Sequence, residues 1–280
     1  MTQTANPLKQ FFRQPALFLK LPSDGQFWAA GSLDMPPNKE LAVLPMTAMD
    51  EITYRTPDAL FNGSAVSSVI QSCVPGIKNA WKTPAVDLAA ILIAIRIATY
   101  GSDMDVGSTC PACDTEGEYT LDLHTLLASL KTLDFSKAVK HGDLEIYFKS
   151  VDYQTQNNLN TQQFEQQRII QSVQQSDEPE EQKLIRMNDA LKQITKLTLM
   201  TIQHSIAGIR TPTAFVTESE FIADFLNNCD RSVFKIIRDH VIQLREDSDL
   251  PPMPITCTQC NNSYKQTVTL DSTSFFEAAS

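Results

Sequence analysis

Apolar and polar residues alternate in the first part of the chain, in the pattern that is typical of short strands. The stretch "LFLKLPSDGQFW" (residues 17–28) alternates and then breaks at Pro-Ser-Asp-Gly, which predicts a strand that runs into a turn. The stretch "ELAVLPM" (residues 40–46) has the same character and is the candidate partner strand. The pattern therefore predicts a small β-element near the N-terminus.

Helical signals follow. Thr47 precedes a segment with acidic residues in its first turn, so we expect Thr47 to cap a short helix. The stretch "GSAVSSVIQSCV" (residues 63–74) predicts a second short helix, which ends at the next Pro-Gly pair.

The strongest helix signal is "TPAVDLAAILIAIRIATYG" (residues 83–101). We expect Thr83 as its N-cap, Pro84 at the first helical position and Gly101 just past its end. Apolar residues go almost all the way round this helix, which predicts a central helix that other elements cover on most faces. A cofactor-binding stripe is a poor alternative because the helix offers few polar groups.

Two more alternating segments lie in the middle of the chain. "EYTLDL" (residues 118–123) and "DLEIYFKSVDY" (residues 143–153) predict strands, the second with one wet face. The segment between them, residues 124–139, predicts a helix or a pair of short helices.

The composition changes at Gln154. Residues 154–175 contain nine glutamines and three asparagines, but apolar residues recur at helical intervals. A disordered, low-complexity segment is one interpretation. We favour a long amphipathic helix, followed by an acidic break at Pro179 and a second helix, which together form an antiparallel pair. Two further helices are predicted, one opened by a capping box of Thr217 with Glu220 and one capped by Asp230.

Two segments of the chain share a pattern built on cysteine. "CPACDTEGEYTLDL" (residues 110–123) and "CTQCNNSYKQTVTLDS" (residues 257–272) each begin with Cys-x-x-Cys, continue through polar turn residues and end in an alternating strand. Each unit has the form of half a zinc ribbon. Two such knuckles supply four sulfurs, and zinc in structural sites is bound tetrahedrally by four such ligands. We therefore predict one structural zinc ion per chain, bound by Cys110, Cys113, Cys257 and Cys260.

The separation of the halves is unusual, since 143 residues lie between Cys113 and Cys257. Loop-closure entropy grows only logarithmically with length, so a folded insertion is tolerable when its ends lie close together. The ribbon is therefore expected to be split by a mostly helical insertion. The alternatives are an accidental pair, a thioredoxin-type redox dithiol, disulfides, ligands that have lost their metal, or iron in place of zinc.

The remaining candidate ligands have weaker patterns. Cys73 and Cys229 lie in apolar helical surroundings and are expected to be small core residues. The histidines, His124, His141, His204 and His240, are scattered along the chain, and only His124 lies near a knuckle. Glycine-rich phosphate loops, nucleophile elbows and His-Glu-x-x-His motifs do not occur, so we expect no enzyme, no small-molecule substrate and no catalytic or cofactor-binding residues.

Charge and hydropathy exclude other classes. The net charge is -10, from 33 acidic and 23 basic residues, and a surface of this sign repels nucleic-acid backbones. No apolar run is long enough to span a bilayer, and the first residues do not have the form of a secretion signal. We therefore expect neither nucleic-acid nor membrane binding as a main function.

Four stretches, taken in order, carry a resemblance to a known family. They are "LFLKLPSDGQFW", "LPMTAMDEITYRTPDALFNG", "VIQSCVPGIKNAWKTPAVDLAAILIAIRIATYG" and "CPAC", and they lie in residues 17–113. Together they resemble the signatures of the baseplate hub proteins of T-even-type bacteriophages with contractile tails. The resemblance implies a virion structural or assembly protein of a myovirus baseplate, made in the host cytoplasm, whose partners are other baseplate and tail proteins. It implies no catalytic residues.

The predicted fold class is α+β, with a small N-terminal β-element, a helical core, a split zinc-ribbon-like module of four cysteines and a mostly helical insertion. The expected regions are a β/helical region (1–107), the first knuckle with its strands (108–152), the helical insertion (153–250) and the second knuckle and strand (251–280). The predicted function is a structural component of the baseplate hub region. The alternatives are an assembly factor that leaves before the virion is complete and a zinc-ribbon module that binds nucleic acid.

Overall fold

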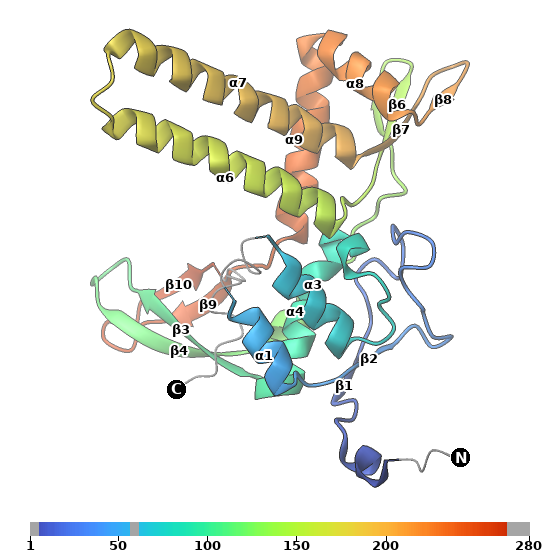
Figure 1. Ribbon diagram of the computed structural model, residues 1–280, viewed down its shortest axis with the longest axis vertical. Helices are drawn as coiled ribbons and strands as arrows, with labels where there is room; N and C mark the ends of the chain where they lie inside the picture. The colour runs from blue at the N-terminus through green and yellow to red at the C-terminus, as the bar shows by residue number, and fades with distance from the viewer. Residues whose placement is uncertain (1–5, 57–61, 268–280) are drawn as a thin grey trace.

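The computed structural model describes residues 6–56 and 62–267 of the chain. Two bodies are stacked along its long axis: the lower one contains the N-terminal elements and two β-hairpins, and the upper one contains long helices and a small sheet (Figure 1). The mixture of helices and small antiparallel sheets confirms the predicted α+β class. No helix in the described ranges has the length and apolar character needed to cross a lipid bilayer.

The lower body begins with the predicted β-element. After a 3-10 turn η1 (Pro7–Phe11), strand β1 (Leu17–Leu19) pairs antiparallel with β2 (Leu41–Val43), with Leu19 opposite Leu41. Two helices follow, α1 (Ala48–Tyr54) and α3 (Ser64–Cys73). Thr47 caps α1 as predicted, because its side chain accepts a hydrogen bond from the Asp50 N–H while the Asp50 carboxylate accepts one from the Thr47 N–H.

Helix α4 (Ala85–Tyr100) is the centre of this body, behind a short 3-10 turn η2 (Ala80–Lys82). Every residue from Ala90 to Arg96 is buried, which confirms the prediction of a helix covered on most of its faces. Gly101 ends the helix with a positive φ of 93°. The apolar core of the lower body extends from β1 and β2 through α3 and α4 to Leu121 and Leu126.

The predicted start of α4 was wrong by one residue. Pro84, rather than Thr83, occupies the N-cap position, and no side chain caps the helix. The cause is a short antiparallel contact with a distant segment: the Thr83 carbonyl accepts a hydrogen bond from the Tyr153 N–H, and the Ala85 N–H donates to the Val151 carbonyl. These two bonds hold residues 83–84 in an extended conformation, which delays the helix.

Each of the two hairpins of the lower body carries a cysteine pair at its tip. Strands β3 (Asp103–Thr109) and β4 (Glu116–Asp122) form the longer one, and β9 (Met253–Thr256) and β10 (Ser263–Gln266) form the shorter one. The strand that precedes Cys110, β3, was not predicted. Between the first hairpin and the upper body lies α5 (Leu123–Ala128), the only helix in the described segment 124–139.

The upper body is built on the helix pair that the periodicity predicts. Helices α6 (Tyr153–Gln175) and α7 (Glu180–Ser205) run antiparallel on either side of Pro179 and project sideways from the molecule (Figure 1). Helices α8 (Ser219–Asn228) and α9 (Arg231–Ser248) follow. Asp230 caps α9 as predicted, but α8 begins after Glu218, so the capping box of Thr217 with Glu220 is not formed.

The upper body also contains a sheet that joins segments far apart in the sequence. Its strand order is β5 (Val139–His141), β6 (Leu144–Phe148), β7 (Ile206–Arg210) and β8 (Phe215–Val216). Ile146 of β6 pairs with Ile209 of β7 and joins a second apolar core with α8 and α9. The molecule thus has two cores, and the strand before α6 belongs to the upper one.

Two polar clusters, one buried and one half-buried, hold the N-terminal segments on the lower body. The Asp87 carboxylate of α4 accepts hydrogen bonds from the N–H and hydroxyl of Ser23 and from the Trp28 indole, at 2.8, 2.5 and 2.8 Å. It thereby fixes the "LPSDGQFW" turn against the central helix. Because all three partners donate, the buried carboxylate is fully bonded.

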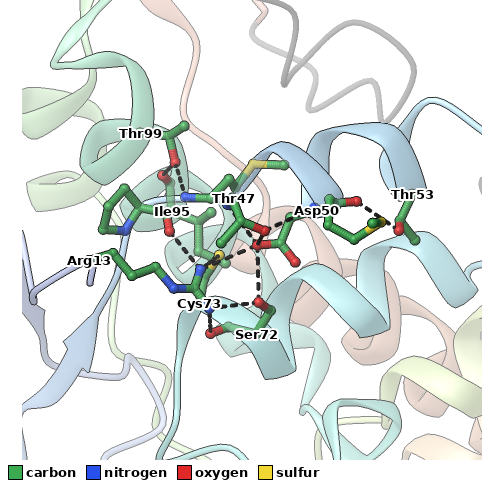
Figure 2. Close-up of polar contacts among 11 residues, drawn as sticks. Arg13, Thr47, Asp50, Thr53, Ser72, Cys73, Ile95 and Thr99 are labelled. Carbon is green, nitrogen blue, oxygen red and sulfur yellow. Dashed lines mark hydrogen bonds and ion pairs between the residues drawn. The ribbon is translucent and has the colours of Figure 1, made fainter. Parts of the chain in front are cut away.

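The second cluster is centred on Arg13 (Figure 2). Its guanidinium donates to the carbonyls of Pro45 and Ser72, both at 2.7 Å, and to the Asp50 carboxylate at 3.2 Å. Asp50 also accepts from the Ser72 hydroxyl, so the chain before β1 is tied to the start of α1 and the end of α3. Sequence reasoning missed both clusters, because hydrogen bonds and ion pairs between distant residues leave no periodic signal.

Candidate metal centre

The structure brings the predicted ligands Cys110, Cys113, Cys257 and Cys260 together. All four Sγ atoms lie within 4.8 Å of one another. In the described residues, no other group of three or more Cys, His, Asp or Glu side chains brings its ligand atoms close enough together to hold a metal ion. The two knuckles face each other from the tips of the two hairpins, which lie side by side in the lower body (Figure 1). The cluster therefore joins residues 144 positions apart in the chain.

The two knuckles have the same backbone structure. In the first, the Cys110 N–H donates to the Thr115 carbonyl at 3.0 Å and the Asp114 N–H donates to the Cys110 carbonyl at 2.9 Å. In the second, the Cys257 N–H donates to Asn262 at 2.9 Å and the Asn261 N–H donates to Cys257 at 3.0 Å.

Both knuckles also turn at the same position. Asp114 and Asn261, each four residues after the first cysteine, have positive φ angles of 54° and 57°. Asp and Asn are the residues that tolerate this conformation best after glycine. The sequence likeness of the two units is therefore a likeness of backbone geometry.

The sulfur separations fit a tetrahedral ion. Cys110 Sγ lies 3.7 Å from Cys260 Sγ, and Cys113 Sγ lies 3.7 Å from Cys257 Sγ. Zinc–sulfur bonds of about 2.3 Å place the sulfurs of a regular tetrahedron about 3.8 Å apart. A disulfide needs about 2.05 Å between its sulfurs, so all four cysteines are free thiols at this spacing.

Backbone N–H groups prepare the sulfurs for a cation. The N–H groups of Cys260 and Gln259 lower the pKa of Cys257 to about 6, and those of Ala112 and Cys113 lower the pKa of Cys110. The Asn262 N–H lowers the pKa of Cys260, but protons shared with the neighbouring sulfurs raise it to about 12. Four adjacent sulfurs cannot all ionise without a positive charge between them, because the thiolates repel one another. A bound metal ion supplies that charge.

Polar contacts lock the two hairpins together beside the sulfurs. The Ser108 hydroxyl lies 2.9 Å from the Tyr264 hydroxyl and donates to the Gln266 side chain at 2.6 Å. The Asn262 amide points at Cys110 Sγ at 3.9 Å. A hydrogen bond with Tyr264 raises the pKa of Tyr119. The two tyrosines, one in the strand after each knuckle, are therefore in contact.

The cluster has the composition of a structural centre. Cys110 and Cys257 are buried and Cys113 and Cys260 are exposed, so the first cysteine of each knuckle lies on the inner side. Four thiolates fill all the positions of a tetrahedral ion and leave no coordination site for a substrate. The arrangement therefore suits architecture rather than catalysis.

The other cysteines and the histidines lie elsewhere in the described part of the chain. Cys73 is fully buried in the lower core and Cys229 packs against the upper one, as expected of small core residues. None of the histidines belongs to the sulfur cluster. The ring of His240 contacts Phe148, and the backbone N–H of His124 donates to the Asp122 cap of α5.

Comparison with known proteins gives one match. The model of the family described as T4 bacteriophage base plate protein matches residues 35–277. No curated protein and no solved structure matches the chain. The family match covers most of the chain, both knuckles and the helical middle that carried no sequence resemblance. The chain therefore belongs to the T4 bacteriophage base plate protein family, which makes it a structural protein of a phage tail that contacts other tail proteins.

Proposed function

We propose that this protein is a structural subunit of the hub region of a contractile-tail baseplate and that it remains in the mature virion. The observation that carries the proposal is the cysteine cluster, which closes the lower body on itself by joining the hairpin β9–β10 to β3–β4. Zinc is the proposed ion, bound by Cys110, Cys113, Cys257 and Cys260. A subunit under mechanical load gains from such a closure, because both hairpins are too small to be stable alone.

The two bodies have different proposed roles. The lower body, with its buried central helix and metal centre, is the rigid part that docks in the baseplate. The helix pair α6–α7 is the part that contacts a partner subunit. It projects from the molecule (Figure 1), and α6 carries a glutamine-rich, largely exposed surface. Polar amide side chains of this kind suit wet interfaces between protein subunits. The division into regions at residues 107, 152 and 250 belongs to this proposal.

Mass spectrometry and cryo-electron microscopy of purified virions test the assignment. The expected result is that the protein is present in intact particles, in stoichiometric amounts, at the centre of the baseplate. Presence only in assembly intermediates would assign it to the class of assembly factors instead. Presence at the baseplate periphery would contradict the hub location.

The role of the helix pair is tested by shortening it. A variant that lacks residues 164–192, closed by a short Gly-Ser turn, removes the outer parts of α6 and α7 but leaves the lower body complete. It is expected to fold, to keep its metal and to fail to support particle assembly. Normal assembly with this variant would contradict the proposed contact between the helix pair and a partner subunit.

Elemental analysis tests the metal. One zinc ion per chain is expected after purification without chelators, and the absence of visible charge-transfer absorption distinguishes zinc from iron. Retention on heparin at physiological salt would instead support the nucleic-acid alternative. The exposed face of β3–β4 opposes that result, because it presents Asp103, Asp105, Glu116, Glu118 and Asp122.

A further inference from the structure

The sheet of the upper body has an inner and an outer face. It lies at the side of the molecule, next to α8 and α9 (Figure 1), and on its inner face Ile146 and Ile209 belong to the upper core. Because side chains alternate along a strand, Glu145 and Arg210 lie on the outer face. There Arg210 is exposed, and Phe215, paired with it from β8, is 50% exposed. The outer face is therefore open to contact.

One row of outer-face side chains crosses the whole sheet. Its members, in strand order β5, β6, β7 and β8, are Lys140, Glu145, Arg210 and Phe215. The Lys140 Nζ atom lies 2.8 Å from one oxygen of the Glu145 carboxylate. The Tyr147 hydroxyl donates to the other oxygen at 3.1 Å. The acid of the row is thus bonded to residues other than Arg210.

Two aromatic rings hold Arg210 in place. Its guanidinium carbon lies 5.4 Å from the centre of the Tyr147 ring and 5.5 Å from that of the Phe215 ring. The two rings meet edge to face, with their centres 5.6 Å apart. In the described residues the Arg210 side chain forms no ion pair and donates no hydrogen bond. Since ring contacts use the face of a guanidinium, its N–H donors remain free for an acceptor from outside, in a fixed orientation.

Gly208 is the residue that allows the Phe215 ring to lie on the sheet. A Cβ atom at position 208 would lie 2.6 Å from Phe215 Cζ, so any side chain there would push the ring away from Arg210. The ring is nonetheless half exposed. A half-exposed aromatic ring beside an arginine with free donors has the composition of a contact surface, because Tyr, Phe and Arg are enriched at protein interfaces.

We propose that Tyr147, Arg210 and Phe215 form a contact site for another tail protein, which supplies an Asp or Glu carboxylate next to an apolar side chain. The carboxylate accepts two N–H bonds from the Arg210 guanidinium, which matches a carboxylate in shape and charge. The apolar side chain covers the exposed part of the Phe215 ring. This site is separate from the surface proposed for α6–α7 and does not depend on it.

The charge of the row favours a carboxylate over a nucleic-acid backbone. A phosphate polymer is held by several cations at once. In this row Glu145 neutralises Lys140, so Arg210 is the one cation of the row without a counter-charge in the described residues. A single guanidinium with two flanking rings suits one carboxylate in an apolar setting.

The experiment converts the proposed ion pair into a covalent bond. The chain, with an affinity tag, is isolated together with its bound tail proteins from phage-infected cells. Arg210→Lys places a primary amine at the site, and a water-soluble carbodiimide condenses that amine with a carboxylate in contact with it. Mass spectrometry is expected to find an amide between position 210 and an Asp or Glu of another tail protein. Arg238→Lys is the matched control, since Arg238 is exposed but pairs with Asp239 of its own chain, and it is expected to link to no other protein.

Two further measurements separate a contact role from a structural one. Arg210→Gln is expected to keep Tm unchanged and to retain about tenfold less of the linked tail protein, or less still, whereas Lys140→Gln is expected to retain it fully. In the wild-type chain, hydroxyl radicals are expected to oxidise Tyr147 and Phe215 several-fold more slowly in the complex than in the isolated protein. Phe221 of α8, which is 63% exposed, is expected to react equally in both.

Three results would overturn the proposal. Equal oxidation of Tyr147 and Phe215 in both states, with no link from position 210, would show that the outer face stays free. A link to a second copy of this chain would assign the face to self-association. Full retention of the tail protein by Arg210→Gln would remove Arg210 from the contact. Because the complexes are isolated on this chain, these results do not depend on its location in the hub or on its presence in mature virions.

Discussion

Cys113 and Cys257 place their Sγ atoms 3.7 Å apart across 144 positions of sequence. This contact and its counterpart between Cys110 and Cys260 close the lower body, and they enclose strands β4 to β9 and helices α5 to α9 in one loop of chain. The closure of this loop therefore depends on a few atoms at the tips of two hairpins.

Replacement of one sulfur ligand is expected to weaken the lower body strongly. The substitution Cys257→Ser should abolish zinc binding and lower Tm by about 10 °C or more, because the loss of a structural metal is among the most destabilising single changes. Cys229→Ser is the matched control, since Cys229 packs beside the upper core and should keep full zinc content. Calorimetry and elemental analysis on the same samples measure both effects, and unchanged stability of Cys257→Ser would contradict a shared metal centre.

Removal of the Asp87 carboxylate is expected to release the N-terminal turn. Asp87→Ala leaves the Ser23 N–H, the Ser23 hydroxyl and the Trp28 indole without their acceptor. Buried donors without partners cost about 1–3 kcal/mol each, so a loss of about 3 kcal/mol in the free energy of unfolding is expected after partial hydration. Urea denaturation measures it, and Ser23→Ala, which removes one donor, should cost distinctly less.

The Arg13 cluster is expected to control access to the chain before β1. Arg13→Ala removes the donors to the Pro45 and Ser72 carbonyls and leaves Asp50 with the Ser72 and Thr47 hydroxyls. Limited proteolysis should cut near residue 13 faster, and stability should fall by about 1–2 kcal/mol. The exposed Lys9→Ala is the control, and equal proteolysis of the two variants would argue against the anchoring role.

Acid is expected to loosen the junction at Asp152, which caps α6 and forms an ion pair with Lys82 at 3.0 Å. Burial raises the pKa of Asp152, but hydrogen bonds from Thr155 and Lys82 lower it by a larger amount. The folded pKa therefore lies below 3.8. Its contribution is therefore complete above the unfolded value and is lost as the pH falls through the folded one.

The substitution Asp152→Asn isolates this effect, because asparagine still caps the helix but does not titrate. The variant is expected to be less stable than the wild type by about 1 kcal/mol at pH 7 and to lose less stability than the wild type between pH 4 and pH 2. Thermal unfolding over this pH range measures the difference. Parallel pH profiles for the two proteins would assign the acid sensitivity to other carboxylates.

The periodic elements of this fold could be predicted from local sequence. The apolar residues of α4, the spacing in α6 and α7 and the alternation in β6 are repeated patterns, and a repeated pattern specifies its own secondary structure. Two helix starts were predicted one residue too early. Thr83 and Thr217 are both suitable caps, but each helix begins one residue later than predicted, and at Thr83 the pairing with residues 151–153 explains the delay.

By itself the sequence determined the helices, the strands after each knuckle and the four sulfurs that belong together, because duplicated spacing and periodicity are local properties of the chain. Tertiary structure alone decided that β6 and β7, which lie on either side of the helix pair in the sequence, share a sheet. It also decided that the Asp87 carboxylate accepts hydrogen bonds from the N-terminal turn. The same holds for the contacts of Arg210 with the Tyr147 and Phe215 rings. These features depend on contacts between distant segments, whose formation depends on the packing of the whole chain and leaves no periodic trace in either segment.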